Sequence, residues 1–439
     1  MKPSNRQNAA DPETMREHLR VLTEDIGVRL AGSDGERAAA DYIARQCRSH
    51  GVSTILEDFP VWERRVESET LDVMVNGTWQ SFPCSLFGGA PSTDGATLEA
   101  PLVYFASQTE YRRSDLSHLT GRAVVHLGCH IATREAYRAL MAARPAFLLF
   151  VDTRYPGEQP LADGLFPAYV REMGAHPTVN VAFMDAWEWK RAGATRARLC
   201  VRGGRLDSRS QNVIAEIPGS DPEAGALYVG AHHDTQAGSV GADDNAVGCA
   251  AMLELTRLFS RRRPRRTLRL VSFGAEEQLS VGSAQYVRRH RDDIERHGRF
   301  MFNFDSFGSL LGWTEVTINA PAPCEQWLTE TMNAADIYFR PSRAVVPFTD
   351  QFPFAAAGVP GLWLRRCNCE TGVFYHHRAD NTSDRVCPRT MALHIDAAAA
   401  FLTRLSEAPL DPPEWSIPAQ QQEQIAAVWQ SHYGGWSEL

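Results

Sequence analysis

Residues 229–255 read "VGAHHDTQAGSVGADDNAVGCAAMLEL", and this stretch decides the fold. It begins in an apolar run typical of a buried β-strand and ends in an apolar run typical of a helix. Two histidines and an aspartate follow the first run, and two adjacent aspartates precede the second. Acidic side chains placed together repel one another unless a proton or a bound cation offsets their charge. The stretch therefore predicts a strand and a helix with a charged site between them.

The same alternation continues on both sides of this stretch. Strand-like apolar runs occur at 212–219, 226–232, 267–275, 300–305 and 361–365. Helix-like runs lie between and after them, at 245–261, 283–297 and 389–405. Apolar strands that alternate with helices are typical of a parallel sheet covered on both faces. The sequence thus predicts an α/β/α sandwich with a mostly parallel central sheet.

The first half of the chain has a different character. Residues 12–50 have helical patterns, and "STILEDFPVW" (53–62) alternates as a strand does. From about residue 67 short strand-like runs and turns dominate. The polar segment "RGGRLDSRS" (202–210) resembles a linker.

These changes predict three parts. A discontinuous catalytic domain comprises residues 1–66 and 207–410, and a smaller β-rich cap, residues 67–206, is inserted into it. Residues 411–439 form a C-terminal tail, in which a Pro-rich turn precedes a short helix with Trp429. This tail docks either on the body or on another subunit, so the sequence leaves a homo-oligomer open.

Composition excludes several classes of protein. The 439 residues are 44% hydrophobic and 22% charged, as in ordinary globular proteins, and the net charge of −8 disfavours nucleic acid and anionic membranes as partners. No apolar run approaches the ~18 residues of a spanning helix. The start has no apolar leader-like segment, and the nine cysteines are an odd number, so we expect reduced thiols and a cytoplasmic location. The pair Cys367 and Cys369 is interpreted as two loop thiols.

Histidines and carboxylates recur where the predicted strands end. They are His232, Asp234, Asp243, Asp244, Glu276, Glu277, Asp305, His376 and His377. Each has an ordinary explanation by itself, such as a helix cap for Asp243 and Asp244 or a solvated surface for Glu276 and Glu277. However, the carboxyl ends of the strands in an open α/β sheet share one edge. Five segments that bring such groups to one edge predict a metal site, and the mixed ligands suit zinc or its first-row neighbours.

The order H-x-D, G-A-D-D-N-A-x-G, E-E, N-x-D, Y-H resembles metallopeptidase family 28 (clan MH) across residues 208–405. This family includes co-catalytic zinc aminopeptidases and glutamate carboxypeptidase. "RLAGSDGERAAADYIARQCRSHG" (29–51) and "SQNVIAEIPG" (210–219) also resemble segments of the family. Residues 119–152 resemble a protease-associated domain more weakly.

The resemblance implies two divalent metal ions, with zinc favoured and manganese or cobalt as alternatives. The implied ligands are His232 and Asp305 on the first ion, Glu277 and His376 on the second, and Asp244 as the bridge. Asp234 would orient His232, Glu276 would be the general base, and Tyr375 would stabilise the oxyanion. Asp243 would stay outside the ligand set, His377 would line the pocket, and the peptide bond between Asp244 and Asn245 would be cis.

Two enzymatic functions fit these residues. The first is an aminopeptidase-type exopeptidase that acts on short peptides. The alternative is a hydrolase or deaminase of the same fold that acts on a small non-peptide amide or aromatic amine in cytosolic catabolism. A non-catalytic receptor is a third hypothesis, which the complete set of ligands and base disfavours.

The segment 345–372 is expected to line the substrate pocket. An apolar pocket would have walls from Phe348, Phe352 and Phe354. The charged candidates are Arg343, Arg365, Arg366 and Glu370, which either recognise substrate charge or form salt bridges.

Overall fold

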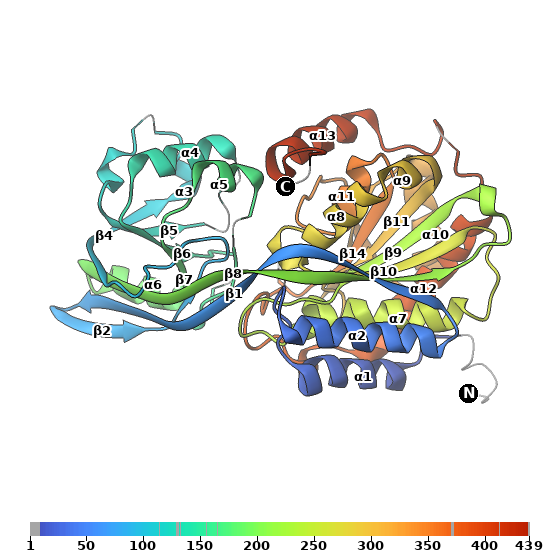
Figure 1. The fold of residues 1–439 in the computed structure, drawn as a ribbon, viewed down its shortest axis with the longest axis horizontal. Coiled ribbons are helices and arrows are strands. Elements are labelled where there is room, and N and C mark those ends of the chain that lie inside the picture. Colours follow the sequence, from blue (N-terminus) through green and yellow to red (C-terminus); the bar gives the residue numbers. More distant parts are fainter. Residues whose placement is uncertain are drawn as a thin grey trace.

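The computed structural model describes residues 9–113, 115–128, 131, 133–154, 156–164, 166–369, 373–411 and 413–437. Figure 1 shows two lobes joined by a pair of long strands, β1 (Ser53–Val75) and β8 (Arg196–Ile217). The larger lobe contains the strand–helix alternation predicted around residues 229–255. No helix in the described part of the chain is long and apolar enough to cross a membrane.

The sheet of the larger lobe is mostly parallel at its centre. Across the lobe its strands are β13 (Phe339–Ser342), β12 (Trp313–Asn319), β14 (Gly361–Cys367), β11 (Gly298–Phe304), β9 (Ala226–His232), β10 (Thr267–Phe273) and β8. Strand β9 runs parallel to both of its neighbours, β10 and β11. The carboxyl ends of these three strands therefore meet at one edge of the sheet.

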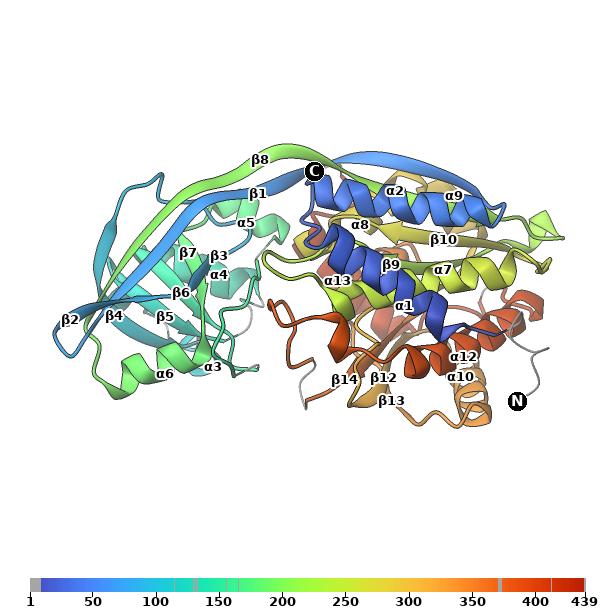
Figure 2. The ribbon, with the colours of Figure 1, turned by 90° about the horizontal axis from the view of Figure 1, so that it is seen from below.

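Helices cover both faces of this sheet, as predicted for an α/β/α sandwich (Figures 1 and 2). One face is covered by α1 (Pro12–Arg20), α2 (Asp34–Ser49), α7 (Val247–Phe259) and α12 (Pro388–Glu407), and α10 (Ala322–Ala334) packs into the same core. The other face is covered by α8 (Val281–Arg289), α9 (Arg291–His297) and α11 (Gln351–Ala356). The C-terminal helix α13 (Ala419–Tyr433) packs on α11.

Successive side chains of β9 point to opposite faces of the sheet, and both faces are buried, so its sequence is a continuous apolar run. Leu227 and Val229 pack into the core on one face, whereas Ala226 and Tyr228 pack into the core on the other. A strand buried on both faces needs apolar residues at every position.

The sheet continues beyond β8 into the smaller lobe, which has apolar cores of its own. Its strands are β2 (Thr78–Phe82), β3 (Cys84–Leu86), β4 (Leu98–Ala106), β5 (Ala123–Leu127), β6 (Phe147–Val151) and β7 (Thr178–Val181). Its helices are α3 (Ser107–Glu110), α4 (Arg134–Ala143), α5 (Ala168–Met173) and α6 (Phe183–Arg191). Strands β4 to β7 are parallel, and two separate apolar clusters cover the faces of this sheet. This lobe is therefore a mixed α/β unit.

The segment 202–210 is not the linker that its sequence predicts. All of it belongs to β8, which pairs with β1 from Ser53 to Val73. Gly203 has a φ of +108°, and a Cβ there would lie 2.4 Å from the carbonyl oxygen of Arg65, so this close crossing requires glycine. The linker interpretation was wrong because a two-stranded ribbon exposed to solvent carries polar residues, as a linker does.

Arg29 connects the N-terminal segment to the loop that follows β9. Its side chain is fully buried, and its guanidinium donates to five backbone carbonyls. The acceptors are Leu22 (2.9 Å), Gly27 (2.9 Å), His233 (2.7 Å), Val240 (2.8 Å) and Gly241 (3.2 Å). Because a guanidinium has five N–H donors in a fixed fork, one side chain satisfies this whole turn of the backbone.

We expect Arg29→Met to lower the free energy of unfolding by about 3 kcal/mol or more, because buried carbonyls lose their donors. Chemical denaturation followed by circular dichroism measures this change. Arg37→Met, at an exposed position of α2, is the matched control and should change stability by less than about 0.5 kcal/mol. Equal effects of the two substitutions would contradict the structural role of Arg29.

Candidate metal centre

The predicted histidines and carboxylates lie at the carboxyl edge of the larger sheet. His232 ends β9, and Asp244 lies in the irregular turn η5 (Ala242–Ala246) before α7. Glu276 and Glu277 begin the short turn η6 (Glu276–Gln278) just after β10. Asp305 follows β11, and His376 and His377 stand in the loop after β14. Parallel strands that end together bring these segments to one place.

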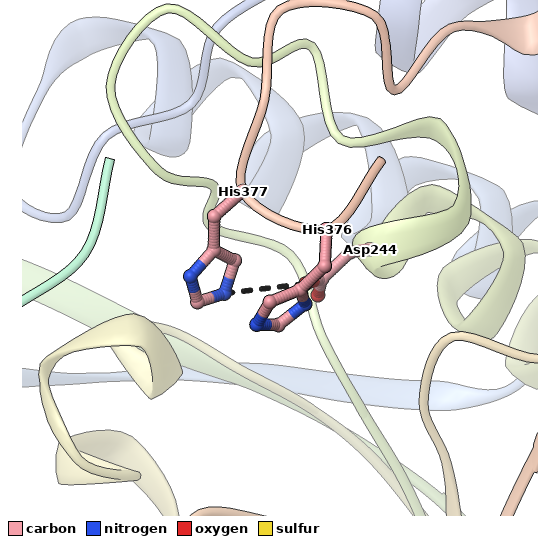
Figure 3. Close-up of side chains that lie close together, drawn as sticks. All are labelled: Asp244, His376 and His377. Carbon is pink, nitrogen blue, oxygen red and sulfur yellow. Dashed lines mark ion pairs between the residues drawn. The ribbon is translucent and has the colours of Figure 1, made fainter. Parts of the chain in front are cut away.

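Asp244 stands at the centre of this group. Its Oδ1 lies 3.1 Å from Nε2 of His232, and its Oδ2 lies 3.2 Å from Nδ1 of His376 and 3.4 Å from Nε2 of His377. Figure 3 shows both imidazole rings directed toward this carboxylate. The two oxygens of Asp244 therefore face two different groups of side chains.

Each of these groups contains another carboxylate. Nε2 of His232 lies 3.6 Å from Oδ1 of Asp305, and Nε2 of His377 lies 3.0 Å from Oε2 of Glu277. In the sets His232, Asp244, Asp305 and Asp244, His376, His377, the candidate donor atoms lie within 4.8 Å of one another. The structure thus forms two adjoining sets of donors that share Asp244.

The motif G-A-D-D-N-A-x-G shapes the backbone at Asp244. The peptide bond between Asp244 and Asn245 is cis, as the family resemblance implies. Asn245 accepts the N–H of Gly248 (2.9 Å) and donates to the carbonyl of Phe304 (2.8 Å), which ties the turn to α7 and β11. Asp243 points away from both donor sets, because it accepts the N–H of Gly308 at 2.7 Å.

Asp234 organises the base of the site. Its Oδ1 lies 3.4 Å from Nδ1 of His232, and its two oxygens accept the backbone N–H groups of Glu276 (2.9 Å) and Glu277 (3.1 Å). The side chain is fully buried. One carboxylate therefore orients a histidine and fixes the two glutamates at the end of the neighbouring strand.

Glu276 lies beside the donor sets without joining them. Its Oε1 accepts the hydroxyl of Ser280 at 2.9 Å, and its Oε2 lies 3.9 Å from Nε2 of His232. Burial raises the pKa of Glu276 well above its usual range, against the attraction of His232, and Asp350 adds repulsion. Asp350 is itself fully buried, and burial raises its pKa to about 7. Asp350 belongs to the segment 345–372 that was expected to line the pocket, although it was not among the residues singled out there.

The charges of the site explain why its carboxylates need a positive partner. Burial raises the pKa of Glu277 to about 7, although His377 lowers it. Burial alone would also raise the pKa of Asp244, but the surrounding histidines outweigh it and hold that pKa well below its usual range. Burial opposes the charged form of His232, yet Asp234, Asp244 and Asp305 raise its pKa well above the usual value. The acids thus favour a cation between them.

The donor set fits a divalent metal ion. Imidazole nitrogens and carboxylate oxygens are the ligands that zinc and its first-row neighbours accept. Oε1 of Glu277 is buried and has no hydrogen-bond partner among the residues that the structure describes. A bound cation would satisfy this atom and offset the repulsion between the acids.

Two predicted site residues lie differently from expectation. The hydroxyl of Tyr375 donates to Oγ of Ser309 (3.1 Å) and the carbonyl of Arg385 (3.3 Å), and Tyr375 does not line the cavity at the donor sets. His377 lines this cavity, as expected, but it also lies as close to Asp244 and Glu277 as a ligand would. Successive residues of a tight turn point in different directions, which separates Tyr375 from the histidines.

A cavity of about 240 Å³ opens over the donor sets. Its apolar walls include Phe166, Leu279, Val346, Phe348 and Trp363. Of the three phenylalanines predicted as walls, only Phe348 lines the cavity. Phe352 and Phe354 are fully buried, because α11 directs them into the cores against α13 and β9.

Most of the charged residues considered for substrate recognition instead bind other protein groups. Arg343 forms an ion pair with Glu325, and Arg366 donates to the carbonyls of Ser309 and Gly312. Arg365 lines the cavity while paired with Glu315. Glu370 lies outside the described residues.

The smaller lobe, predicted as a cap, supplies one wall of the cavity, through residues that the sequence did not single out. Arg154, Asp163, Gly164, Phe166 and Pro167 all line it. The N–H of Ala162 donates to the carbonyl of His377 at 2.9 Å, so the two lobes are joined at the donor sets themselves. A contact between segments more than 200 residues apart leaves no local pattern in the sequence.

Comparison with known proteins finds a family match within the larger lobe. Residues 212–402 match the model of peptidase family M28. Carboxypeptidase Q of Rattus norvegicus is 27% identical over 408 residues, which cover 88% of this chain and 84% of the relative. Aminopeptidase YwaD of Bacillus subtilis (strain 168) is 24% identical over 371 residues, which cover 82% of this chain and 77% of the relative.

Solved structures share the mixed α/β fold over most of the chain. The zinc aminopeptidase BSAP from Bacillus subtilis superposes with a TM-score of 0.75 at 19% identity, covering 92% of this chain and 98% of that structure. A peptidase M28 precursor from Shewanella amazonensis SB2B gives a TM-score of 0.73 at 20% identity, with 92% and 95% covered. The mixed α/β fold with its large sheet is therefore that of the M28 structures.

The two neighbouring histidines can be distinguished by metal analysis. We expect His376→Ala to lose about one metal ion per chain and His377→Ala to keep both, because the family resemblance makes His376 the ligand. Inductively coupled plasma mass spectrometry of the purified variants measures the stoichiometry. The reverse result would make His377 the ligand, and two ions retained in both variants would contradict the predicted second site.

Proposed function

We propose that this chain, whose residues 212–402 form a peptidase family M28 domain, is a zinc-dependent aminopeptidase that removes the first residue of short peptides. The family identifies a metallo-hydrolase of peptide bonds. The observation that carries the finer proposal is the position of Asp244, whose Oδ1 faces His232 and whose Oδ2 faces His376 and His377. A carboxylate with this arrangement suits a bridge between two ions.

The residues around Asp244 would hold the two ions. His232 and Asp305 lie on one side, and Glu277 and His376 on the other, with His377 beside them. Bound there, two zinc ions would act as Lewis acids toward the scissile carbonyl and supply an acidified water. The zinc aminopeptidase from Bacillus subtilis, which shares this fold, supports zinc as the metal.

Glu276 is suited to move the proton. Its backbone is fixed by Asp234 and its Oε1 by Ser280, which leaves Oε2 directed toward the donor sets. A carboxylate held there can accept a proton from the attacking water and pass it to the departing amine. Its separation from the ligands allows it to do this without releasing a metal ion.

The charges of the cavity favour a substrate with a free amino group. Arg154 is paired with Asp152, and Arg365 is paired with Glu315, so the cations that line the cavity already have acidic partners. Asp163 also lines the cavity; its Oδ1 accepts the N–H of Gly164 (2.7 Å) and lies 3.9 Å from Nδ1 of His377, and no lysine or arginine among the described residues forms an ion pair with it. We propose that Asp163 binds the terminal ammonium of the peptide.

The cavity also limits the size of the substrate. Its volume of about 240 Å³ lies below the ~300–1,000 Å³ of pockets for drug-sized ligands, which favours short peptides. We propose that the smaller lobe, predicted as residues 67–206, acts as a cap, because its segment around Asp163 closes one side of the cavity.

A small aromatic amide or amine is a second candidate substrate. It is favoured by one observation: Phe166, Phe348 and Trp363 surround a cavity of this small volume. Both candidates use the same metal ligands and the same base, so the difference between them lies in the walls of the cavity.

Glu276→Gln tests the base. We expect kcat to fall by roughly 10³-fold or more, while metal content and melting temperature stay unchanged, because the glutamine keeps the shape but cannot accept a proton. Activity assays and metal analysis of the same preparation measure both. Glu295→Gln, at an exposed position of α9, is the matched control and should keep full activity. Loss of metal from Glu276→Gln would make Glu276 a ligand instead.

Acetylation of the substrate's amino group tests the preference for a free N-terminus. We expect leucyl- and alanyl-arylamides to be hydrolysed, and their N-acetylated forms to be at least about tenfold poorer in kcat/KM, because the acetyl group removes the charge that Asp163 would bind. Asp163→Asn should raise KM for the free amines and narrow this difference. Turnover confined to amides or amines without an aminoacyl group would favour the second candidate.

A further inference from the structure

Phe166 lies where the cavity over the donor sets meets the space between the lobes. It lines the metal cavity of about 240 Å³, and it also lines two larger cavities of about 440 Å³ and 760 Å³. Trp62 and Arg171 line both of these larger cavities, and neither residue lines the metal cavity. The ring of Phe166 therefore stands between the metal cavity and the inter-lobe space.

Two glycines of the smaller lobe hold this ring in place. Gly88 and Gly164 form a parallel β-bridge, and the N–H of Gly88 donates to the carbonyl of Asp163 at 2.8 Å. A Cβ on Gly88 would lie 2.6 Å from Cζ of Phe166, and a Cβ on Gly164 would lie 2.4 Å from Cε2. The ring thus packs directly against the backbone of these two glycines, and a side chain at either position would displace the ring.

The backbone on either side of Phe166 is anchored to both lobes. Before it, the N–H of Ala162 donates to the carbonyl of His377 at 2.9 Å. After it, the hydroxyl of Tyr169 donates to the carbonyl of Ile131 at 2.9 Å, and its ring packs edge-on against His432 of α13. These anchors on either side place Phe166 as a wall of the metal cavity.

We propose that Phe166 limits the length of the substrate by closing the metal cavity toward the inter-lobe space. This inference rests on the proposed peptidase function and adds a residue that determines specificity. Each further residue of an extended peptide needs about 3.3–3.6 Å of length, which the small cavity does not offer beyond the ring. Removal of the ring would join that cavity to one of about 440 Å³.

The 440 Å³ cavity has walls that suit an extended peptide. Trp62 and Val61 offer apolar surface, while Gln278, Gln285 and Asp207 offer polar groups for a backbone. Leu279 lines this cavity and the metal cavity alike, so the two spaces adjoin at Leu279 as well as at Phe166. A peptide that passes the position of the ring therefore has a place to continue.

The experiment compares kcat/KM for Ala-Ala, Ala-Ala-Ala and Ala-Ala-Ala-Ala in the zinc-loaded full-length enzyme. In the wild type we expect the tetrapeptide to be clearly poorer than the dipeptide. Phe166→Ala should raise the tetrapeptide-to-dipeptide ratio by about tenfold, and Phe166→Leu, which keeps most of the bulk, should raise it by about two- to threefold. If Phe166→Ala does not fold, the result for Phe166→Leu decides the test.

Phe348→Ala is the matched control. Phe348 lines the metal cavity but neither of the two larger cavities, so the same truncation enlarges the metal cavity without opening it toward them. The ratio should stay within about twofold of the wild type. An equal gain in Phe348→Ala would overturn the inference, since cavity volume alone would then set substrate length.

The remaining outcomes separate this inference from the proposed function. If the wild type hydrolyses the dipeptide and the folded, metal-loaded Phe166 variants keep the wild-type ratio, the inference is overturned and the peptidase function stands. If the wild type hydrolyses tetrapeptide and dipeptide equally well, the inference is likewise overturned. If the wild type hydrolyses no peptide at all, the proposed function fails, and the inference fails with it.

Discussion

The carboxylate of Asp244 is the point on which the larger lobe is organised. It is buried between histidines on two sides and lies near Asp305 and Glu277, which carry the same charge. Such a group of acids is stable only with positive charge between them, and the fold supplies many of the contacts that hold it together. Parallel strands bring the ligands to one edge, and Asn245 fixes the turn that carries Asp244.

A surrounding layer of buried polar groups holds this arrangement in place. Arg29 binds the carbonyls of the loop after β9, and Asp234 binds the backbone of Glu276 and Glu277. Glu36 of α2 accepts the N–H of Ala275 (2.9 Å) and the hydroxyl of Ser210 (2.7 Å), which fixes the residue just before Glu276. Burial raises the pKa of Glu36 to about 8. Helix α2, far away in the sequence, thus helps to position the glutamates.

The two lobes meet at the donor sets, and this contact defines the cavity. The larger lobe supplies all of the predicted ligands, whereas the smaller lobe supplies Asp163 and Phe166 as walls. The ribbon of β1 and β8 connects the lobes over a long span, but the bond from Ala162 to His377 joins them directly at the site. In the functions proposed above, the first lobe provides the chemistry and the second selects the substrate.

The sequence by itself determined the α/β class and the strand ends that carry the histidines and carboxylates. These features depend on local periodicity and on the rule that parallel strands end at one edge, both of which are visible in a linear pattern. Metal ligation itself remains a prediction. Only the tertiary structure decided that 202–210 is a strand, that Phe352 and Phe354 are core residues, and that Tyr375 points away from the cavity. Side-chain directions in turns and contacts between distant segments depend on how whole elements pack, and no local pattern records that packing.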